Sequence, residues 1–122
     1  IISKLKKNGS RISLFIEPTI ADVKASKILN ADCVELHTGR ICNLINKKKS
    51  HSSEFRKIGK AVNLASSLGL EVHAGHGLTY HSAKIISKIK NIKEFNIGHF
   101  LIGESMYIGL PKAIKKFKKI IS

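Results

Sequence analysis

The segment Ala74-Gly75-His76-Gly77-Leu78-Thr79 carries the clearest candidate for acid–base chemistry in this sequence of 122 residues. His76 has a glycine on each side, so its backbone is unobstructed and its imidazole is free to face a ligand. An imidazole with a pKa of about 6.5 can donate or accept a proton at neutral pH. The alternative interpretation is a plain turn, in which the glycines supply positive φ angles and the histidine has no role.

A second histidine ends the segment Asn96-Ile97-Gly98-His99, which is followed by a predicted helical turn. Gly77 and Gly98 would let backbone N–H groups approach a phosphate closely, and His99 would add a donor. Phosphate sites of this kind use a helix N-terminus after a strand. The alternative is an ordinary turn between a strand and a helix.

Glu35 lies in the middle of the alternating segment Val34-Glu35-Leu36-His37-Thr38-Gly39. A carboxylate there is costly to bury unless it is paired. It would therefore orient a catalytic histidine or stabilise a cationic intermediate, or else form a structural ion pair with Lys or Arg. We interpret His37 and His73 as interior histidines with hydrogen-bond partners. The histidine spacing is not typical of zinc, so we predict no metal.

These residues fall at the ends of segments that alternate between strand-like and helix-like patterns. We predict a single domain over residues 1–122, with strands near 11–17, 32–38, 70–74 and 95–98. Helices are predicted from Pro18, over 58–68, from about Ser82 and from Pro111. The remaining segments are predicted as a loop or short helix over 40–52 and a helical turn over 103–109.

The order of strands and helices predicts βαβ units and a parallel sheet. The last three strands keep apolar residues on one face and polar or small residues on the other, whereas a sheet covered on both faces is apolar throughout. This favours a barrel over a flavodoxin-like sheet, because polar residues at the barrel mouth can form a site. The predicted fold class is α/β, of the TIM (β/α)8-barrel family, with about four C-terminal βα units. Such a half barrel leaves two open sheet edges.

The formal net charge of +14 raises the question of nucleic-acid binding. However, the basic residues are 19 Lys and only 3 Arg, and aromatic residues make up 6% of the chain. Nucleic-acid sites favour Arg and stacking aromatics, so we interpret the lysines as solvated surface. No apolar run is long enough to span a membrane. Cys33 and Cys42 are expected to be reduced thiols in the cytoplasm.

The segments quoted above, together with Ser13-Leu14-Phe15-Ile16-Glu17 and Ala65-Ser66-Ser67-Leu68-Gly69-Leu70, resemble successive segments of the pyridoxine 5′-phosphate synthase family. The similarity runs from about Arg11 to the C-terminus, and several segments in order are more specific than any single motif. The resemblance implies a TIM barrel that condenses 3-amino-2-oxopropyl phosphate with 1-deoxy-D-xylulose 5-phosphate, releasing pyridoxine 5′-phosphate, phosphate and water. It implies no metal or organic cofactor.

Carried over by the resemblance, His76 matches the proton donor and Glu35 the acidic residue that stabilises the transition state. Gly77, Gly98 and His99 match positions that bind substrate, chiefly its phosphate. The family's general-base Glu lies in the N-terminal half of the barrel, which has no equivalent here. Because that half is missing, we expect a fragment, a truncated gene product or a piece of a split enzyme, inactive alone. The first residue is Ile1 and not Met, so we expect a chain that is either processed or lacks its true start.

Three functions therefore remain at the level of the sequence. The first is a vitamin B6 biosynthetic enzyme represented by its C-terminal half. The second is a non-catalytic half barrel that binds phosphate, and the third is a basic protein associated with nucleic acid. For the first two we expect a homo-oligomer or a complementing N-terminal half as partner, and no association with a membrane.

Overall fold

The computed structural model describes residues 1–122 as an α/β structure built on one four-stranded sheet. The strands lie side by side in chain order, and every neighbouring pair is parallel. They are β1 (Ser13–Ile16), β2 (Cys33–His37), β3 (Glu71–Gly75) and β4 (Ile92–Asn96). A sheet whose strand order follows the chain, with helical crossovers between strands, is what successive βα units of a barrel produce.

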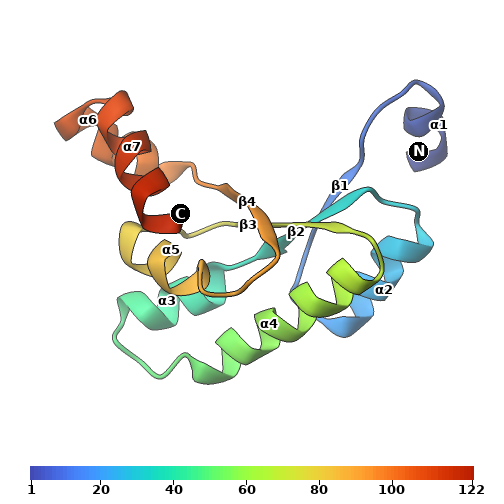
Figure 1. Ribbon diagram of the computed structural model, residues 1–122, viewed down its shortest axis with the longest axis horizontal. Helices are drawn as coiled ribbons and strands as arrows, with labels where there is room; N and C mark the ends of the chain where they lie inside the picture. Colours follow the sequence, from blue (N-terminus) through green and yellow to red (C-terminus); the bar gives the residue numbers. More distant parts are fainter.

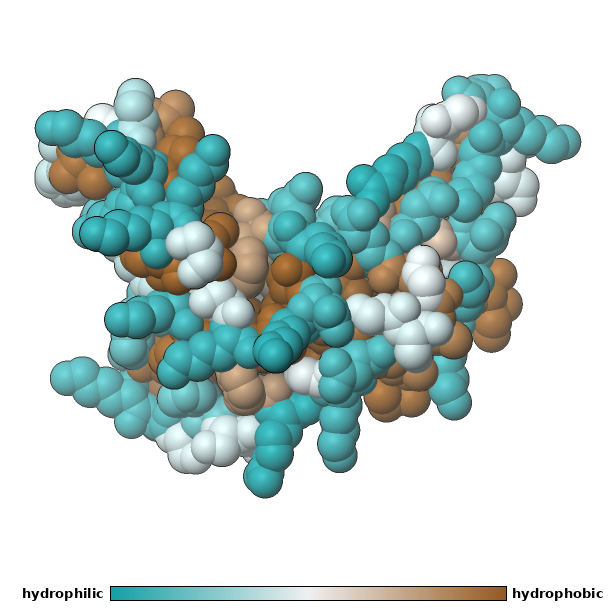
Figure 2. Space-filling model, in the orientation of Figure 1, coloured by the Kyte–Doolittle hydropathy of each residue, from teal (hydrophilic) through white to brown (hydrophobic).

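Seven helices connect and flank the strands: α1 (Ile2–Lys7), α2 (Ile20–Ile28), α3 (Gly39–Asn46), α4 (Ser52–Ser67), α5 (Tyr80–Ile86), α6 (His99–Ile108) and α7 (Leu110–Ile121). In Figure 1, α2, α3 and α4 lie below the sheet, while α6 and α7 rise at one end and α1 at the other. The surface between these raised ends is hollowed in Figure 2. One face of the sheet is thus covered by helices, and the other is open.

The core lies between the sheet and the helices that cover it. Val34, Leu36, Val72 and Ala74 point to the helix-covered face and are fully buried. The predicted alternation is therefore present in the structure. On the open face the register places Glu35 beside His73, and Phe15, next to Glu35 on β1, remains 58% exposed.

Turn and cap residues determine where the helices begin and end. The side chain of Thr19 accepts a hydrogen bond from the backbone N–H of Asp22 and starts α2. Thr79 and Ser82 form a reciprocal capping box that starts α5. Gly69 follows α4 with a φ of 75°, a conformation that costs glycine little. The cap at Thr79 begins α5 three residues after His76, which keeps the intervening loop short.

An ionic cluster lies at the amino-terminal part of the open face. Arg11 pairs with Glu71 at 2.8 Å, and Glu71 lies 2.9 Å from Nε2 of His73. His73 is only 5% exposed, so it is the interior histidine with a partner that the sequence predicts. The hydrogen bond with His73, followed by that with Arg11, lowers the pKa of Glu71.

Several sequence-based element predictions were wrong in detail. The last strand runs from Ile92 to Asn96 and not over 95–98, because an irregularity in its pairing with β3 near Val72 and His73 disturbs the alternation. Residues 103–109 belong mostly to α6, a helix of ten residues whose apolar side chains form no single stripe. No helix was expected at α1. None of the helices is long and apolar enough to cross a membrane.

Candidate active site at the carboxyl ends of the strands

A cleft of about 880 Å³ opens at the carboxyl ends of the strands. All five residues selected from the sequence line it, namely Glu35, His76, Gly77, Gly98 and His99. The other lining residues are Phe15, Leu78, Asn96, Phe100, Gly103 and Glu104. The structure thus brings together residues from β2 and from the segments after β3 and β4. The chemical roles of the five residues selected from the sequence remain predictions.

Glu35 is half-buried on the floor of the cleft, in the centre of β2. Its Oε2 accepts a hydrogen bond of 2.7 Å from the side-chain amide of Asn96. None of the ion pairs in the structure includes Glu35, so the structural ion pair considered from the sequence is not formed within this chain. A carboxylate with one neutral donor keeps acceptor capacity for a ligand.

Gly75, the last residue of β3, makes room for this carboxylate. A Cβ atom at this position would overlap Oε1 of Glu35 and approach Cβ of Asn96 to 3.3 Å. Only a residue without a side chain therefore allows Glu35 to lie flat against the neighbouring strand. Glycine is favoured before His76 because a side chain there would overlap Glu35, which the sequence alone did not reveal.

Thr38 holds the end of β3 and the start of the loop that carries His76. This side chain is fully buried, and its hydroxyl lies 2.7 Å from the carbonyl oxygen of Gly75 and 2.8 Å from that of His76. The backbone N–H of Thr38 also donates to the carbonyl of Gly75. His76 adopts a φ of 77°, which costs a residue with a side chain of the order of 1–3 kcal/mol. The buried hydroxyl supports this conformation.

The imidazole of His76 is exposed to the cleft and lies beside that of His37, with ring centroids 4.7 Å apart. Nδ1 of His37 in turn lies 2.7 Å from Oε1 of Glu17, and Phe15 contacts the same ring edge to face. The interpretation of His37 as an interior histidine was wrong, because it is the last residue of β2 and lies where the strands end. It does have the hydrogen-bond partner that was expected.

The N-terminus of α6 forms the opposite wall. Gly98 precedes the helix and His99 is its first residue, so backbone N–H groups of the first turn have no partner within the helix. Phe100 packs against Tyr80 and Phe117 with centroid distances of 5.0 and 6.0 Å. This aromatic cluster fixes the start of α6 against α5 and α7, which makes the wall a preformed feature.

Cys42 lies behind the loop that carries His76, and its Cβ would be 3.2 Å from a side chain at Gly77. Burial raises the pKa of the Cys42 thiol, so this residue is a packing group and not a thiolate nucleophile. Both cysteines of the chain are free and buried.

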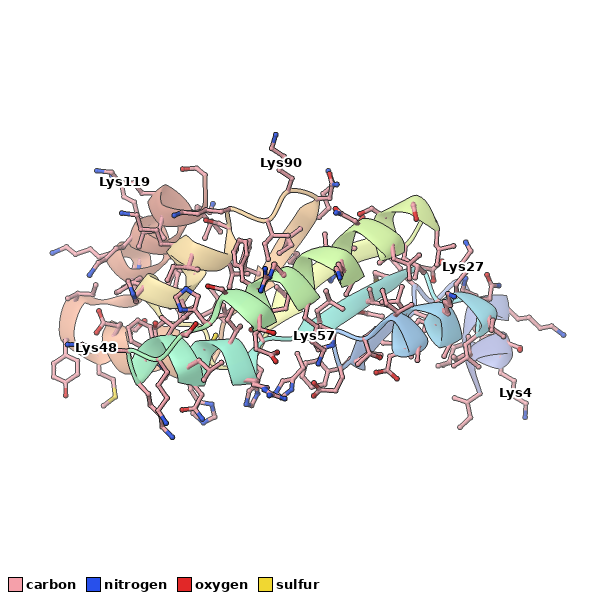
Figure 3. The ribbon with its side chains drawn as sticks, turned by 90° about the horizontal axis from the view of Figure 1, so that it is seen from below. Lys4, Lys27, Lys48, Lys57, Lys90 and Lys119 are labelled. Carbon is pink, nitrogen blue, oxygen red and sulfur yellow. The ribbon has the colours of Figure 1, made fainter.

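The lysines that produce the high net charge are distributed over the molecule. Figure 3 labels six of them on separate elements or loops, and they project toward different sides: Lys4, Lys27, Lys48, Lys57, Lys90 and Lys119. None of the lysines lines the cleft. This distribution fits the interpretation of solvated surface better than a single basic face for nucleic acid.

Glu17, His37 and Asn96 were not among the candidate site residues. Asn96 was quoted as the start of the segment that ends in His99, and its hydrogen bond with Glu35 joins residues 61 positions apart. Glu17 was quoted only as the end of a strand segment. The signal for all three was a polar residue at a strand end, which is informative only when the register between strands is known.

This arrangement defines the chain as a half barrel of the TIM type with a polar cleft at the carboxyl ends of its strands. The chain belongs to the family described as pyridoxal phosphate biosynthesis protein PdxJ, whose model matches residues 1–122. The family resemblance and the fold class predicted from the sequence are thereby confirmed.

Curated relatives carry the name pyridoxine 5′-phosphate synthase. The chain is 58% identical over 120 residues to the protein of that name from Pelagibacter ubique, covering 98% of this chain and 50% of the relative. It is 47% identical over 121 residues to the one from Zymomonas mobilis, covering 99% and 46%. For Rhodospirillum rubrum the identity is 45% over 118 residues, covering 97% and 47%. The chain spans about half the length of the curated relatives it matches.

Proposed function

We propose that this chain supplies the C-terminal half of a pyridoxine 5′-phosphate synthase. The observation that carries the proposal is the convergence on one cleft of Glu35, His76, Gly77, Gly98 and His99, which lie far apart in the sequence. The family membership supports the reaction class. The substrates we propose are 3-amino-2-oxopropyl phosphate and 1-deoxy-D-xylulose 5-phosphate.

In this proposal the two ends of the cleft have different tasks. The first turn of α6, with Gly98 and His99, binds a substrate phosphate through backbone N–H groups and an imidazole, because a helix N-terminus favours an anion. Gly77 leaves the backbone of the opposite loop open to the ligand. A phosphate held at this wall would direct the carbon skeleton of the substrate toward His76 and Glu35.

His76 acts as the proton donor, because its exposed imidazole lines the same cleft as Glu35 and stays free when His99 binds the phosphate. Glu35 stabilises the positive charge that develops on the condensing substrate. Its hydrogen bond with Asn96 fixes the carboxylate at the floor of the cleft. A positioned, partly desolvated carboxylate stabilises a cation more strongly than one that is free in water.

The remaining half of the active site is supplied by further strands, from the same polypeptide or from a second one. In the four-stranded sheet, β1 and β4 each have one neighbour, and the open face has no covering layer. Unpaired edges of this kind are templates for further strands. We propose that the partner is a complementing N-terminal half or a further copy in a homo-oligomer, in the cytoplasm, where free thiols such as those of Cys33 and Cys42 persist.

The test is the substitution His76→Ala in the protein that carries this chain. We expect formation of pyridoxine 5′-phosphate to fall at least about a hundredfold, the usual contribution of a general acid, with phosphate binding retained. His51→Ala is the matched control, since His51 lies outside the cleft. Turnover of His76→Ala within a few-fold of the unsubstituted protein would contradict the assignment of the proton donor.

A second candidate function is phosphate binding without catalysis. It is favoured by the start of α6, whose free backbone N–H groups suit an anion without acid–base chemistry, and by the chain spanning about half the length of the curated relatives it matches. For this reason we expect the 122-residue chain alone to bind phosphate and to show no turnover with the two substrates. Turnover near that of a full-length enzyme would contradict the division of the site between two halves.

A further inference from the structure

We propose that Glu17 and His37 are positioning residues that hold the imidazole of His76 in the cleft. The proposal rests on the proposed function, in which His76 donates a proton, and it adds two residues to that site. Glu17 follows β1, His37 ends β2 and His76 follows β3, so the three side chains come from neighbouring strand ends.

The contacts between these residues form a continuous chain. Oε1 of Glu17 lies 2.7 Å from Nδ1 of His37, and the ring of His37 lies 4.7 Å from that of His76 at an interplanar angle of 59°. Phe15 also contacts the His37 ring edge to face, with centroids 5.3 Å apart. His37 is therefore held by Glu17 and Phe15 beside His76, whereas no hydrogen bond or ion pair joins Glu17 to His76.

The ring of His76 depends on this contact more than on any other. No side-chain hydrogen bond of His76 is formed within the chain, and the residue has a φ of 77° in an exposed loop. An exposed imidazole without a partner samples several rotamers. A proton donor must instead point at one atom of its substrate, so the ring of His37 supplies the restraint.

Gly39 provides independent support, because it leaves space for the two rings. A Cβ atom at Gly39 would lie 2.8 Å from Nε2 of His37 and 2.8 Å from Cδ2 of His76. The glycine that begins α3 therefore permits the side-by-side placement of the imidazoles. The two rings and this glycine make a fitted arrangement and not a chance proximity of exposed histidines.

The carboxylate of Glu17 also determines the tautomer of His37. It accepts a hydrogen bond from Nδ1, so the proton of neutral His37 resides on Nδ1 and Nε2 is left as an acceptor. In many active sites a carboxylate orients a histidine, and that histidine then contacts the reactive group. Here the imidazole of His37 is oriented by Glu17 and restrains the imidazole of His76. In the proposed function His76 is the residue that contacts the substrate.

The first test uses the imidazole signals of His76 in nuclear magnetic resonance spectra of the protein that carries this chain. We expect Glu17→Ala to shift or broaden these signals although the two side chains are not in contact. Glu94→Ala is the matched control, because Glu94 lies 3.7 Å from a different histidine, His73. If the His76 signals of Glu17→Ala coincide with those of the unsubstituted protein, the proposal is overturned.

The second test separates positioning from a general effect on structure. Glu17 is 56% exposed, so we expect Glu17→Ala to leave the unfolding midpoint unchanged. We expect kcat to fall about tenfold to a hundredfold, with KM within about twofold, as for a small misplacement of a catalytic group. Glu17→Gln keeps an acceptor oxygen for Nδ1 and should restore most of kcat. Equal losses in the Ala and Gln variants would overturn the role of the hydrogen bond.

The two tests distinguish failure of this inference from failure of the proposed function. The His76 signals report the position of the ring whether or not the protein makes pyridoxine 5′-phosphate. Altered signals in Glu17→Ala together with full activity in His76→Ala would preserve the restraint and refute the proposed proton donor. Unaltered signals together with loss of activity in His76→Ala would refute the restraint alone.

Discussion

Replacing Thr38 with valine tests how the loop that carries His76 is held. Valine has nearly the same shape as threonine, so the change removes the hydroxyl and creates no cavity. In the structure that hydroxyl lies 2.7 Å from the carbonyl oxygen of Gly75 and 2.8 Å from that of His76, and Thr38 is fully buried. The substitution therefore removes a buried donor from two acceptors.

The expected loss of stability depends on the hydrogen bonds that each carbonyl oxygen keeps after the substitution. The carbonyl of Gly75 still accepts from the backbone N–H of Thr38, at 2.8 Å, so it is not left without a partner. The carbonyl of His76 belongs to an exposed residue that water can reach. We therefore expect a loss of about 1–2 kcal/mol in the free energy of unfolding, near the net value of one or two hydrogen bonds and below the cost of an orphaned buried group.

The assay is urea unfolding combined with the backbone resonances of His76 and Gly77. Thr38→Val should lower the unfolding midpoint and shift these resonances, because the positive φ of 77° at His76 loses its support. Thr38→Ser is the control: it keeps the hydroxyl and should leave the resonances in place, at a cost of about 0.8 kcal/mol for the methyl group. Wild-type stability and unchanged resonances in Thr38→Val would refute the reasoning.

Three other substitutions test the packing and the charges in the same unfolding assay. Gly59→Ala should raise the free energy of unfolding by about 0.5–1 kcal/mol, since the residue lies inside α4 and a Cβ there meets nothing within 4 Å; a lower midpoint would contradict this. Gly75→Ala should cost about 1–3 kcal/mol by overlap with Glu35, and the double variant with Glu35→Ala should recover most of that loss; an equal loss in both would exclude the overlap as the cause. The backbone N–H of Ile12 and then Lys6 lower the pKa of Asp32, so its contribution to stability is present above about pH 4 and is lost as the pH falls through the lowered value. Between about pH 5 and about pH 3 the midpoint should therefore fall less in Asp32→Asn than in the unsubstituted protein, and an identical fall would rule out this contribution.

The strands and most helices could be predicted because their patterns are local. The alternation around Val34 and Val72, and the stripe of α4 through Ile58 and Val62, follow from side chains within a few turns of one another. By contrast, the apolar side chains of α6 form no single stripe and none of its residues is fully buried, so periodicity could not show its length. Local patterns reveal an element when one of its faces is buried and fail when none is.

The site could be predicted only as far as single strand ends. His76 and His99 stand out beside glycines, whereas the pairs Glu35 with Asn96 and Glu17 with His37 join different strands. Which residues pair across strands depends on register, and the register is set by the packing of the whole sheet. Physical contact between distant segments was therefore the information that the sequence did not supply.

The sequential strand order also bears on how the chain folds during synthesis. Each strand pairs with the one made just before it, so every parallel pair closes over a single crossover and none waits for a segment made much later. The part of the cleft that contains Glu35 and His76 can form once β3 joins β2. The first turn of α6 is added last, when Phe100 reaches Tyr80 and Phe117. Vectorial synthesis would thus place His76 and Glu35 before the start of α6, which carries Gly98 and His99.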